Sequence, residues 1–307
     1  MRTAYLNTLY GLAQKDNRVY AVLADNGIIV YDKYQKDFPE QYLNLGISEA
    51  NIVAVAAGMA SRGKIPFVYT IGVFLAHRAF EFIRNDVSLQ NQNVKLIGTG
   101  AGMVYSTLGS THHATEDLGG LRTLPNLQII TPASPLEVHK ATVAAYEYEG
   151  PVYIRLGTNR EPEIYSEEYD FVIGKAVRIH DGKDITVIAM GSILKDVLDA
   201  VRVLGDESIG VRVINMHTVR PIDKDAVIAA IEETGRIITV EDHNVIGGLG
   251  SAVAEVIAEY GKGVQFERIG LKGFTEGYGT YEQVKEMNGI GKNRICEIAR
   301  RMMGNAD

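Results

Sequence analysis

The chain has 307 residues, of which 46% are apolar and 22% charged, the balance of a globular protein and not of a disordered or fibrous one. This length exceeds what one hydrophobic core usually organises, so it favours two domains. The net charge of −7, with basic residues scattered along the chain, argues against nucleic acid as a partner. No apolar stretch approaches the roughly 20 residues that span a bilayer, and the N-terminus lacks a signal-peptide pattern, so we expect a cytoplasmic protein without membrane contact.

In the first half of the chain, short apolar, β-branched runs alternate with segments of helical period. This pattern predicts parallel strands joined by crossover helices. The expected strands are residues 19–25, 66–71, 94–99, 127–131 and 152–156. The expected helices are residues 3–14, 48–61, 76–89 and 135–148, with Ser48 at an N-cap.

A polar stretch without periodicity separates the two halves, and its sequence HDGKD predicts a hairpin turn. We therefore expect a first domain at residues 1–160, a linker at 161–183 and a second domain at 184–307. In the second half the alternation resumes, with expected strands at 185–190, 211–215 and 237–241, expected helices at 194–204 and 224–233, and a glycine-rich loop and helices at the end. The predicted fold class is α/β, with two domains that are each a mainly parallel sheet flanked by helices.

Glu49 is the first residue that could carry chemistry. The segment LGISEANIVAVAAG places it in the first turn of an apolar helix, just after a short strand that ends at Gly46. A carboxyl in apolar surroundings binds its proton more tightly and is able to donate or share it. Acidic residues also favour the first turn of a helix because of the helix dipole. From the residues alone, both interpretations of Glu49 remain open.

The segment GSTHHATEDLGGLR carries adjacent histidines, His112 and His113, where a loop leads into a helix. Imidazoles at such a junction could polarise a substrate or transfer a proton, and capping of the helix is the simpler alternative. We predict no metal site in this chain, because the other histidines are isolated and no cysteine cluster exists. The single cysteine, Cys296, is expected to be a buried apolar side chain.

Four segments in this order, LGISEANIVAVAAGMA, GSTHHATEDLGGLRTLPN, TVRPID and VEDHNVIGGLGSAV, resemble the transketolase superfamily from its pyrimidine-binding domain onward. The resemblance covers essentially the whole chain and is closest to the separate C-terminal section of two-chain transketolases. It implies a pyrimidine-binding domain followed by a transketolase C-terminal domain. It also implies the transfer of a two-carbon ketol unit from a ketose phosphate to an aldose phosphate.

The resemblance assigns the cofactor-binding residues of thiamine diphosphate. It implies that Glu49 hydrogen-bonds the aminopyrimidine ring, in the role of a catalytic residue. An aromatic side chain of the segment IPFVYTIGVFLAHRAFEF should stack on that ring. Phe74 matches best, and a one-residue length difference nearby keeps Tyr69 and Phe80 as alternatives.

The resemblance also assigns residues to the substrate. His112 matches the histidine of the family's G-P-T-H motif, which faces the substrate hydroxyls and is here a catalytic and substrate-binding candidate. Arg2, together with Arg160 or the less favoured Arg155, should contact the sugar phosphate, because the forked donors of a guanidinium match phosphate oxygens.

Several positions depart from the family pattern. Leu108 and, approximately, Gly100 stand where the family usually carries an acidic residue and a histidine, and Ser110 replaces the proline of G-P-T-H. The chain also lacks the Gly-Asp-Gly motif that holds the diphosphate and Mg²⁺, since Gly205-Asp206-Glu207 differs from it. We therefore expect the Mg²⁺ ligands on a partner chain, an N-terminal subunit that carries the motif, in an α2β2 assembly.

Three other functions remain open at this stage. Two of them belong to more distant relatives in the same superfamily, namely a deoxyxylulose-phosphate synthase-like subunit that uses pyruvate and the β-type subunit of a 2-oxo acid dehydrogenase. The third is a non-catalytic scaffold that only binds a partner. The GSTHH loop favours sugar substrates, and the retention of Glu49 argues against the scaffold.

Overall fold

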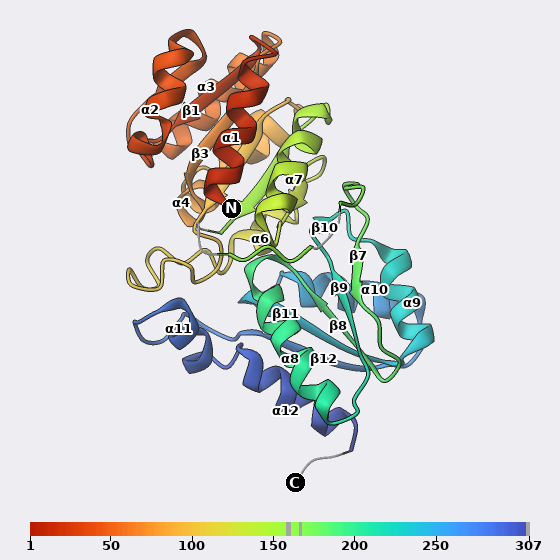
Figure 1. The fold of residues 1–307 in the computed structure, drawn as a ribbon. Coiled ribbons are helices and arrows are strands. Elements are labelled where there is room, and N and C mark those ends of the chain that lie inside the picture. Colours follow the sequence, from red (N-terminus) through yellow and green to blue (C-terminus); the bar gives the residue numbers. More distant parts are fainter. Residues whose placement is uncertain (158–160, 166–167, 305–307) are drawn as a thin grey trace.

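The computed structural model describes residues 1–157, 161–165 and 168–304. Its first half is built on a seven-stranded sheet in the order β10-β5-β6-β4-β3-β1-β2 (Figure 1). All neighbouring strands are parallel except β10, which is antiparallel to β5. The strands are β1 (Val19–Leu23), β2 (Tyr42–Asn44), β3 (Ile65–Ile71), β4 (Lys95–Thr99), β5 (Gln128–Ile130), β6 (Val152–Leu156) and β10 (Thr218–Arg220).

Helices cover both faces of this sheet, because alternate strand residues point to opposite sides and both sides are apolar. On one face α1 and α7 pack against side chains such as Phe67 and Ile154, and on the other face α3 and α4 pack against Val22 and Val68. The helical elements are α1 (Arg2–Ala13), α2 (Ile28–Asp37), η1 (Pro39–Gln41), α3 (Glu49–Ser61), α4 (Gly72–Arg78), α5 (Phe80–Phe82), η2 (Ile83–Ser88), α6 (Asp117–Leu121) and α7 (Pro135–Glu147).

The second half is built on a five-stranded sheet in the order β12-β11-β8-β9-β7, in which only β7 is antiparallel to its neighbour. Helices α8 and α12 cover one face, while α9 and α10 cover the other. The strands are β7 (Val177–His180), β8 (Ile185–Ala189), β9 (Val211–Asn215), β11 (Arg236–Asn244) and β12 (Gln265–Leu271). The helical elements are η3 (Gly191–Ile193), α8 (Leu194–Asp206), α9 (Lys224–Glu233), α10 (Leu249–Tyr260), α11 (Tyr281–Met287) and α12 (Lys292–Met302).

The predicted fold class is confirmed, and the details differ in three places. Strand β7 lies inside the expected linker and pairs with β9, so the HDGKD turn joins β7 to β8 without making them a hairpin. The expected helix at 76–89 begins earlier, at Gly72, and breaks into α4, α5 and the π-helical turn η2. Ser48 occupies the N-cap position of α3, yet its hydroxyl donates to Leu45 O and Gly46 O, so its side chain does not cap the helix.

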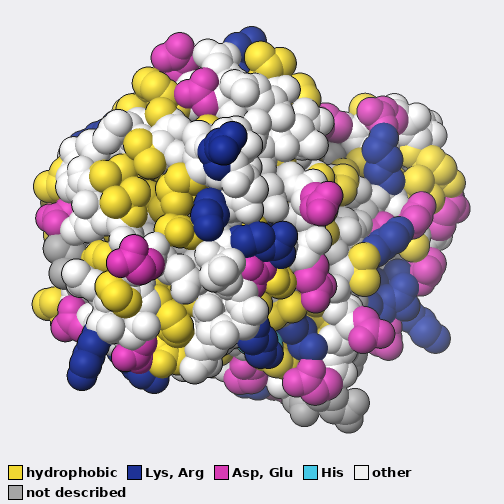
Figure 2. Space-filling view, turned by 90° about the horizontal axis from the view of Figure 1, so that it is seen from above, with side chains coloured by type: hydrophobic (Ala, Val, Ile, Leu, Met, Phe, Trp, Pro, Cys, Tyr) yellow, Lys and Arg dark blue, Asp and Glu magenta, His cyan; other side chains and the backbone are white. Residues whose placement is uncertain are grey.

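Strand β10 links the two halves of the chain, because it lies in the expected second domain and extends the first sheet at its β5 edge. On the face drawn in Figure 2, basic and acidic side chains are interspersed with apolar ones. Within the described ranges, no helix has both the length and the apolar character that a membrane span requires.

Candidate functional site

Glu49 opens helix α3 and is buried, with 4% of its surface exposed. The chain reaches this position through Gly46, whose φ of +73° is a left-handed conformation that glycine adopts without strain. The carboxylate oxygen Oε2 of Glu49 accepts a hydrogen bond from Nη1 of Arg78 at 3.2 Å. A carboxylate is therefore held at low exposure next to a cation that is itself 52% exposed.

Phe74 and Arg78 lie one turn apart on α4, so their side chains share a face of the helix. The guanidinium carbon of Arg78 lies 4.1 Å from the centroid of the Phe74 ring, a cation–π contact. The other neighbour of this ring is His112, whose imidazole packs against it edge-on at 5.3 Å with an interplanar angle of 67°. The structure thus brings together three of the predicted site residues, Glu49, Phe74 and His112, and adds Arg78.

These side chains meet at one edge of the first sheet because of how the chain is wound. Helix α4 follows β3 directly, and the loop that carries His112 follows β4, the neighbouring parallel strand. Both segments therefore leave the sheet at the carboxyl ends of its strands, where parallel α/β sheets place their ligands.

The two alternative aromatic residues lie elsewhere. Tyr69 is buried on β3 and stacks on Tyr5 at 5.7 Å, and burial raises the pKa of its phenol. The ring of Phe80 packs against Gly120 of α6. Of the three aromatic candidates, Phe74 is the one that contacts Arg78, the residue that donates a hydrogen bond to Glu49.

The arginines predicted to contact phosphate have different surroundings. Arg2 lies beside Tyr69, a residue near the carboxyl end of β3. The Nε atom of Arg2 is buried and has no hydrogen-bond partner among the described residues. Arg160 falls outside the described residues.

The structure corrects the assignment of Arg155. Arg155 is 2% exposed and lies between the two halves of the chain. Its Nε donates to Asp117 at 3.0 Å, and its Nη1 donates to Asp242 at 2.7 Å. Its Nη2 donates to Ala114 O at 2.6 Å. Because all three nitrogens are engaged by groups of the protein itself, Arg155 is a structural ion pair and not a phosphate ligand.

Cys296 is buried in the second core as expected, and burial raises the pKa of its thiol. The described residues contain no group of three or more His, Cys, Asp or Glu side chains placed to hold a metal ion. An open cavity of about 690 Å³ in the second domain is lined by residues such as Arg268, Lys272 and Arg294, and by none of the predicted site residues.

The chain is an α/β protein of two domains, whose buried carboxylate and aromatic ring lie at the carboxyl edge of the first sheet, where such sheets place their ligands. Comparison with known proteins agrees. Residues 1–161 match the family "Transketolase, pyrimidine binding domain", and residues 174–295 match "Transketolase, C-terminal domain". The chain belongs to the transketolase family, and this membership implies thiamine diphosphate as the cofactor.

Individual relatives cover nearly the whole chain. One subunit of the apulose-4-phosphate transketolase of Phocaeicola vulgatus is 35% identical over 97% of this chain and 96% of its own length. The 6-deoxy-6-sulfo-D-fructose transketolase subunit SqwH of a Clostridium species is 33% identical over 98% of this chain and 94% of its own length. A solved structure described as "Split gene transketolase, inactive beta4 tetramer" is 36% identical and has a TM-score of 0.89. The match covers 100% of this chain and 98% of that chain.

The observed residues fit the pyrimidine ring of thiamine diphosphate. The guanidinium of Arg78 is planar, lies over Phe74 and donates to Glu49. A planar ring with an N–H donor would make the same two contacts, stacking on Phe74 and donating to Glu49. Glu49 and Phe74 are therefore the residues of this chain that would hold the ring.

Proposed function

We propose that this chain is one subunit of a two-chain transketolase, which transfers a two-carbon ketol unit from a ketose phosphate to an aldose phosphate. The observation that supports this proposal is the cluster of Glu49, Phe74 and His112, in which a buried carboxylate, an aromatic ring and an imidazole are joined through Arg78 and Phe74. The names of the relatives support it, since two of them are subunits of transketolases that act on different sugars.

When bound, thiamine diphosphate supplies the carbanion chemistry of ketol transfer. Glu49 would accept a hydrogen bond from the pyrimidine ring, and the low exposure of its carboxylate would strengthen that bond because little water competes for it. The imidazole of His112 packs edge-on against Phe74, its Nδ1 lies 3.0 Å from Oγ1 of Thr111, and its Nε2 would bond a sugar hydroxyl. Arg2 and Arg160 bind the phosphate of the sugar.

A partner chain completes the site in this proposal. An N-terminal subunit with a Gly-Asp-Gly motif holds the diphosphate and Mg²⁺, and two copies of each chain form an α2β2 assembly. Support comes from the Phocaeicola relative, which is itself one subunit of a transketolase, and from the solved split-gene transketolase that is described as an inactive β4 tetramer. By analogy, this chain alone should be inactive.

The test is turnover with thiamine diphosphate and Mg²⁺, measured for this chain alone and for the chain co-expressed with a partner that carries Gly-Asp-Gly. Turnover of a ketose phosphate by the pair, and by the pair only, supports the proposal. Consumption of pyruvate would move the function to the synthase or dehydrogenase branch, and a pair that assembles without any turnover would favour the non-catalytic scaffold.

The role of the arginines is tested with the same pair. Because guanidinium groups select phosphate, kcat/KM should be far higher for a ketose phosphate than for the phosphate-free sugar. Equal kcat/KM values for the two sugars would remove the argument for Arg2 and Arg160.

A further inference from the structure

The loop that carries His112 contacts the second domain at Thr275, among other residues. This loop, residues 101–114, is here named the His112 loop, and it is closed at its base where Ala114 N donates to Gly102 O at 2.9 Å. At its far end it meets residues 272–279, here named the Thr275 loop, which connect β12 to α11. Thr275 and His113 are 162 positions apart in the sequence, so the contact joins the two halves of the chain.

Thr275 bonds two residues of the His112 loop, one on each side of His112. Its Oγ1 lies 2.6 Å from Nδ1 of His113 and 2.8 Å from Oγ of Ser110, and its carbonyl oxygen accepts from Oγ of Ser110 at 2.9 Å. Ser110 is also the position at which the sequence departs from the proline of the G-P-T-H motif. A proline there would have no hydroxyl to bond Thr275.

The direction of these hydrogen bonds follows from the chemistry of His113. Its ring is 1% exposed, and Nε2 lies 3.2 Å from Tyr105 O, a carbonyl that can only accept. Nε2 therefore carries the proton and Nδ1 is an acceptor, which agrees with the lowering of the His113 pKa by burial. Thr275 must then donate its hydroxyl proton to His113, so a single hydroxyl group completes the bonding of the buried ring.

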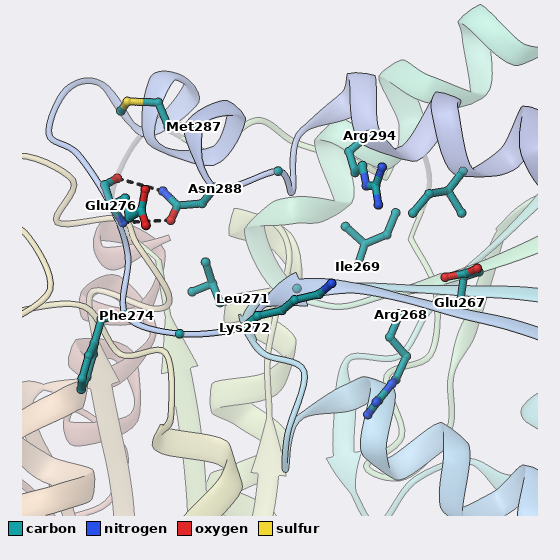
Figure 3. Close-up of a pocket in the computed structure, with 14 residues that line it drawn as sticks. Glu267, Arg268, Ile269, Leu271, Lys272, Phe274, Glu276, Met287, Asn288 and Arg294 are labelled. Carbon is teal, nitrogen blue, oxygen red and sulfur yellow. Dashed lines mark hydrogen bonds between the residues drawn. The ribbon is translucent and has the colours of Figure 1, made fainter. Parts of the chain in front are cut away.

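The Thr275 loop is held in place by hydrogen bonds to Asn288 and by a packing contact with Gly109. Asn288 of the second domain accepts from Glu276 N at 2.9 Å and donates to Glu276 O at 3.0 Å, and Figure 3 draws both hydrogen bonds. On the other side, the ring of Tyr278 fills the space beside Gly109, where a Cβ would lie 2.6 Å from the ring. His112 N in turn donates to Gly109 O at 2.9 Å.

We propose that Thr275 is a positioning residue that fixes the His112 loop through Ser110 and His113, so that the second domain helps to select the sugar phosphate. The inference rests on the proposed function, because it takes the substrate-facing role of His112 from there. His112 stands between the two bonded residues, and its ring direction depends on where they are held. Small displacements of a substrate-contacting group cost substrate affinity and rate.

The experiment uses the assembled pair with Thr275→Val, which keeps the shape of the side chain and removes its hydroxyl, and with Thr275→Ser, which restores the hydroxyl. We expect Thr275→Val to raise KM for the sugar phosphate about tenfold with a smaller change in kcat. The dissociation constant of thiamine diphosphate, measured by calorimetry, should not change, and Thr275→Ser should return KM to within about twofold. Thr123→Val, at an exposed threonine whose hydroxyl bonds Gly120 O of its own turn, is the control.

Hydrogen exchange of this chain alone tests the contact without relying on activity. Thr275→Val should speed exchange of the backbone amides of residues 105–113, while Thr123→Val should not. Unchanged exchange would show that Thr275 does not hold the loop and would overturn the inference. An unchanged KM, or equal shifts in KM and in cofactor affinity, would also overturn it, whereas absence of turnover in the unmodified pair would overturn the proposed function instead.

Discussion

Arg78 donates a hydrogen bond to Glu49 over 3.2 Å while its guanidinium lies over the neighbouring aromatic ring at 4.1 Å. In this arrangement the cation takes up both contacts that we propose for the pyrimidine ring of the cofactor. Arg78 is half exposed, so its side chain has room to swing toward solvent. The ring can stack on this face of Phe74 and bond Glu49 only after Arg78 has left.

The first prediction concerns cofactor affinity. Arg78→Ala should lower the dissociation constant of thiamine diphosphate in the assembled pair about three- to tenfold, because the cation–π contact and the exposed ion pair that must be broken are each worth about 1 kcal/mol or less. Calorimetric titration measures the constant. Arg84→Ala, at an exposed arginine whose guanidinium bonds its neighbour Asn85, is the matched control. Weaker binding by Arg78→Ala would instead show that Arg78 holds Glu49 in position for the ring.

The second prediction concerns the junction between the domains. Arg155→Met leaves Asp117 and Asp242 buried without their cation, which should lower the free energy of unfolding by about 3–5 kcal/mol. Denaturant unfolding followed by circular dichroism measures it. Arg202→Met, at an arginine side chain that is 82% exposed, should change stability by no more than about 0.5 kcal/mol. A loss below about 1 kcal/mol for Arg155→Met would contradict the account of this ion-pair network.

The third prediction is a pH dependence at His243. Burial lowers the pKa of His243 to about 4. Its Nδ1 donates a hydrogen bond to Asn244 O at 2.7 Å. Its Nε2 has no hydrogen-bond partner among the described residues and lies 3.9 Å from Asp117. The carboxylates of Asp117 and Asp242, the guanidinium of Arg155 and the carboxyl group of Glu241, whose pKa burial raises to about 7, surround the ring. Between pH 4 and 6.5, His243 binds a proton in the unfolded chain but not in the folded chain. The contribution of His243 to the free energy of unfolding therefore falls as pH falls through that window.

The corresponding measurement compares the unfolding free energy of the unmodified chain and of His243→Asn, which keeps a donor for the Asn244 carbonyl, between pH 4 and 7. The unmodified chain should lose up to about 3 kcal/mol relative to the variant as pH falls from 6.5 to 4. His77→Asn, at an exposed histidine, controls for the loss of an imidazole in general. Parallel stability curves for the unmodified chain and His243→Asn would show that His243 titrates alike in the folded and unfolded states.

Much of the fold could be predicted, because parallel strands buried on both faces are continuous apolar runs that the sequence displays directly. Strand β6 and helix α9, for example, begin and end where expected. The pairing of β10 with β5 could not be predicted, since three residues of an edge strand have no periodicity that reveals a partner about 90 residues away. The early start of α4 was hidden by Gly72, whose place is explained only by the close approach of Thr99 O and the Tyr153 hydroxyl.

The candidate site was predictable where chemistry leaves a local pattern. Glu49 follows a strand and opens an apolar helix, and His112 belongs to a recognisable loop. Arg78 was missed, although its spacing of four residues from Phe74 is a signal that could have been used. The burial of Arg155 and the contact of Thr275 with His113 depend on how the two domains meet, and no short-range feature of the sequence encodes that arrangement.

The most direct test of the central claim is the effect of Glu49→Gln on turnover of a ketose phosphate by the assembled pair. The substitution keeps the size of the side chain and removes its charge, so the pair should still assemble, as judged by sedimentation. We expect kcat to fall at least about 100-fold, the usual scale for loss of a positioned proton-sharing group. If the Glu49→Gln pair assembles and turns over at a rate within about twofold of the unmodified pair, Glu49 does not act on the cofactor and the account of this site is wrong.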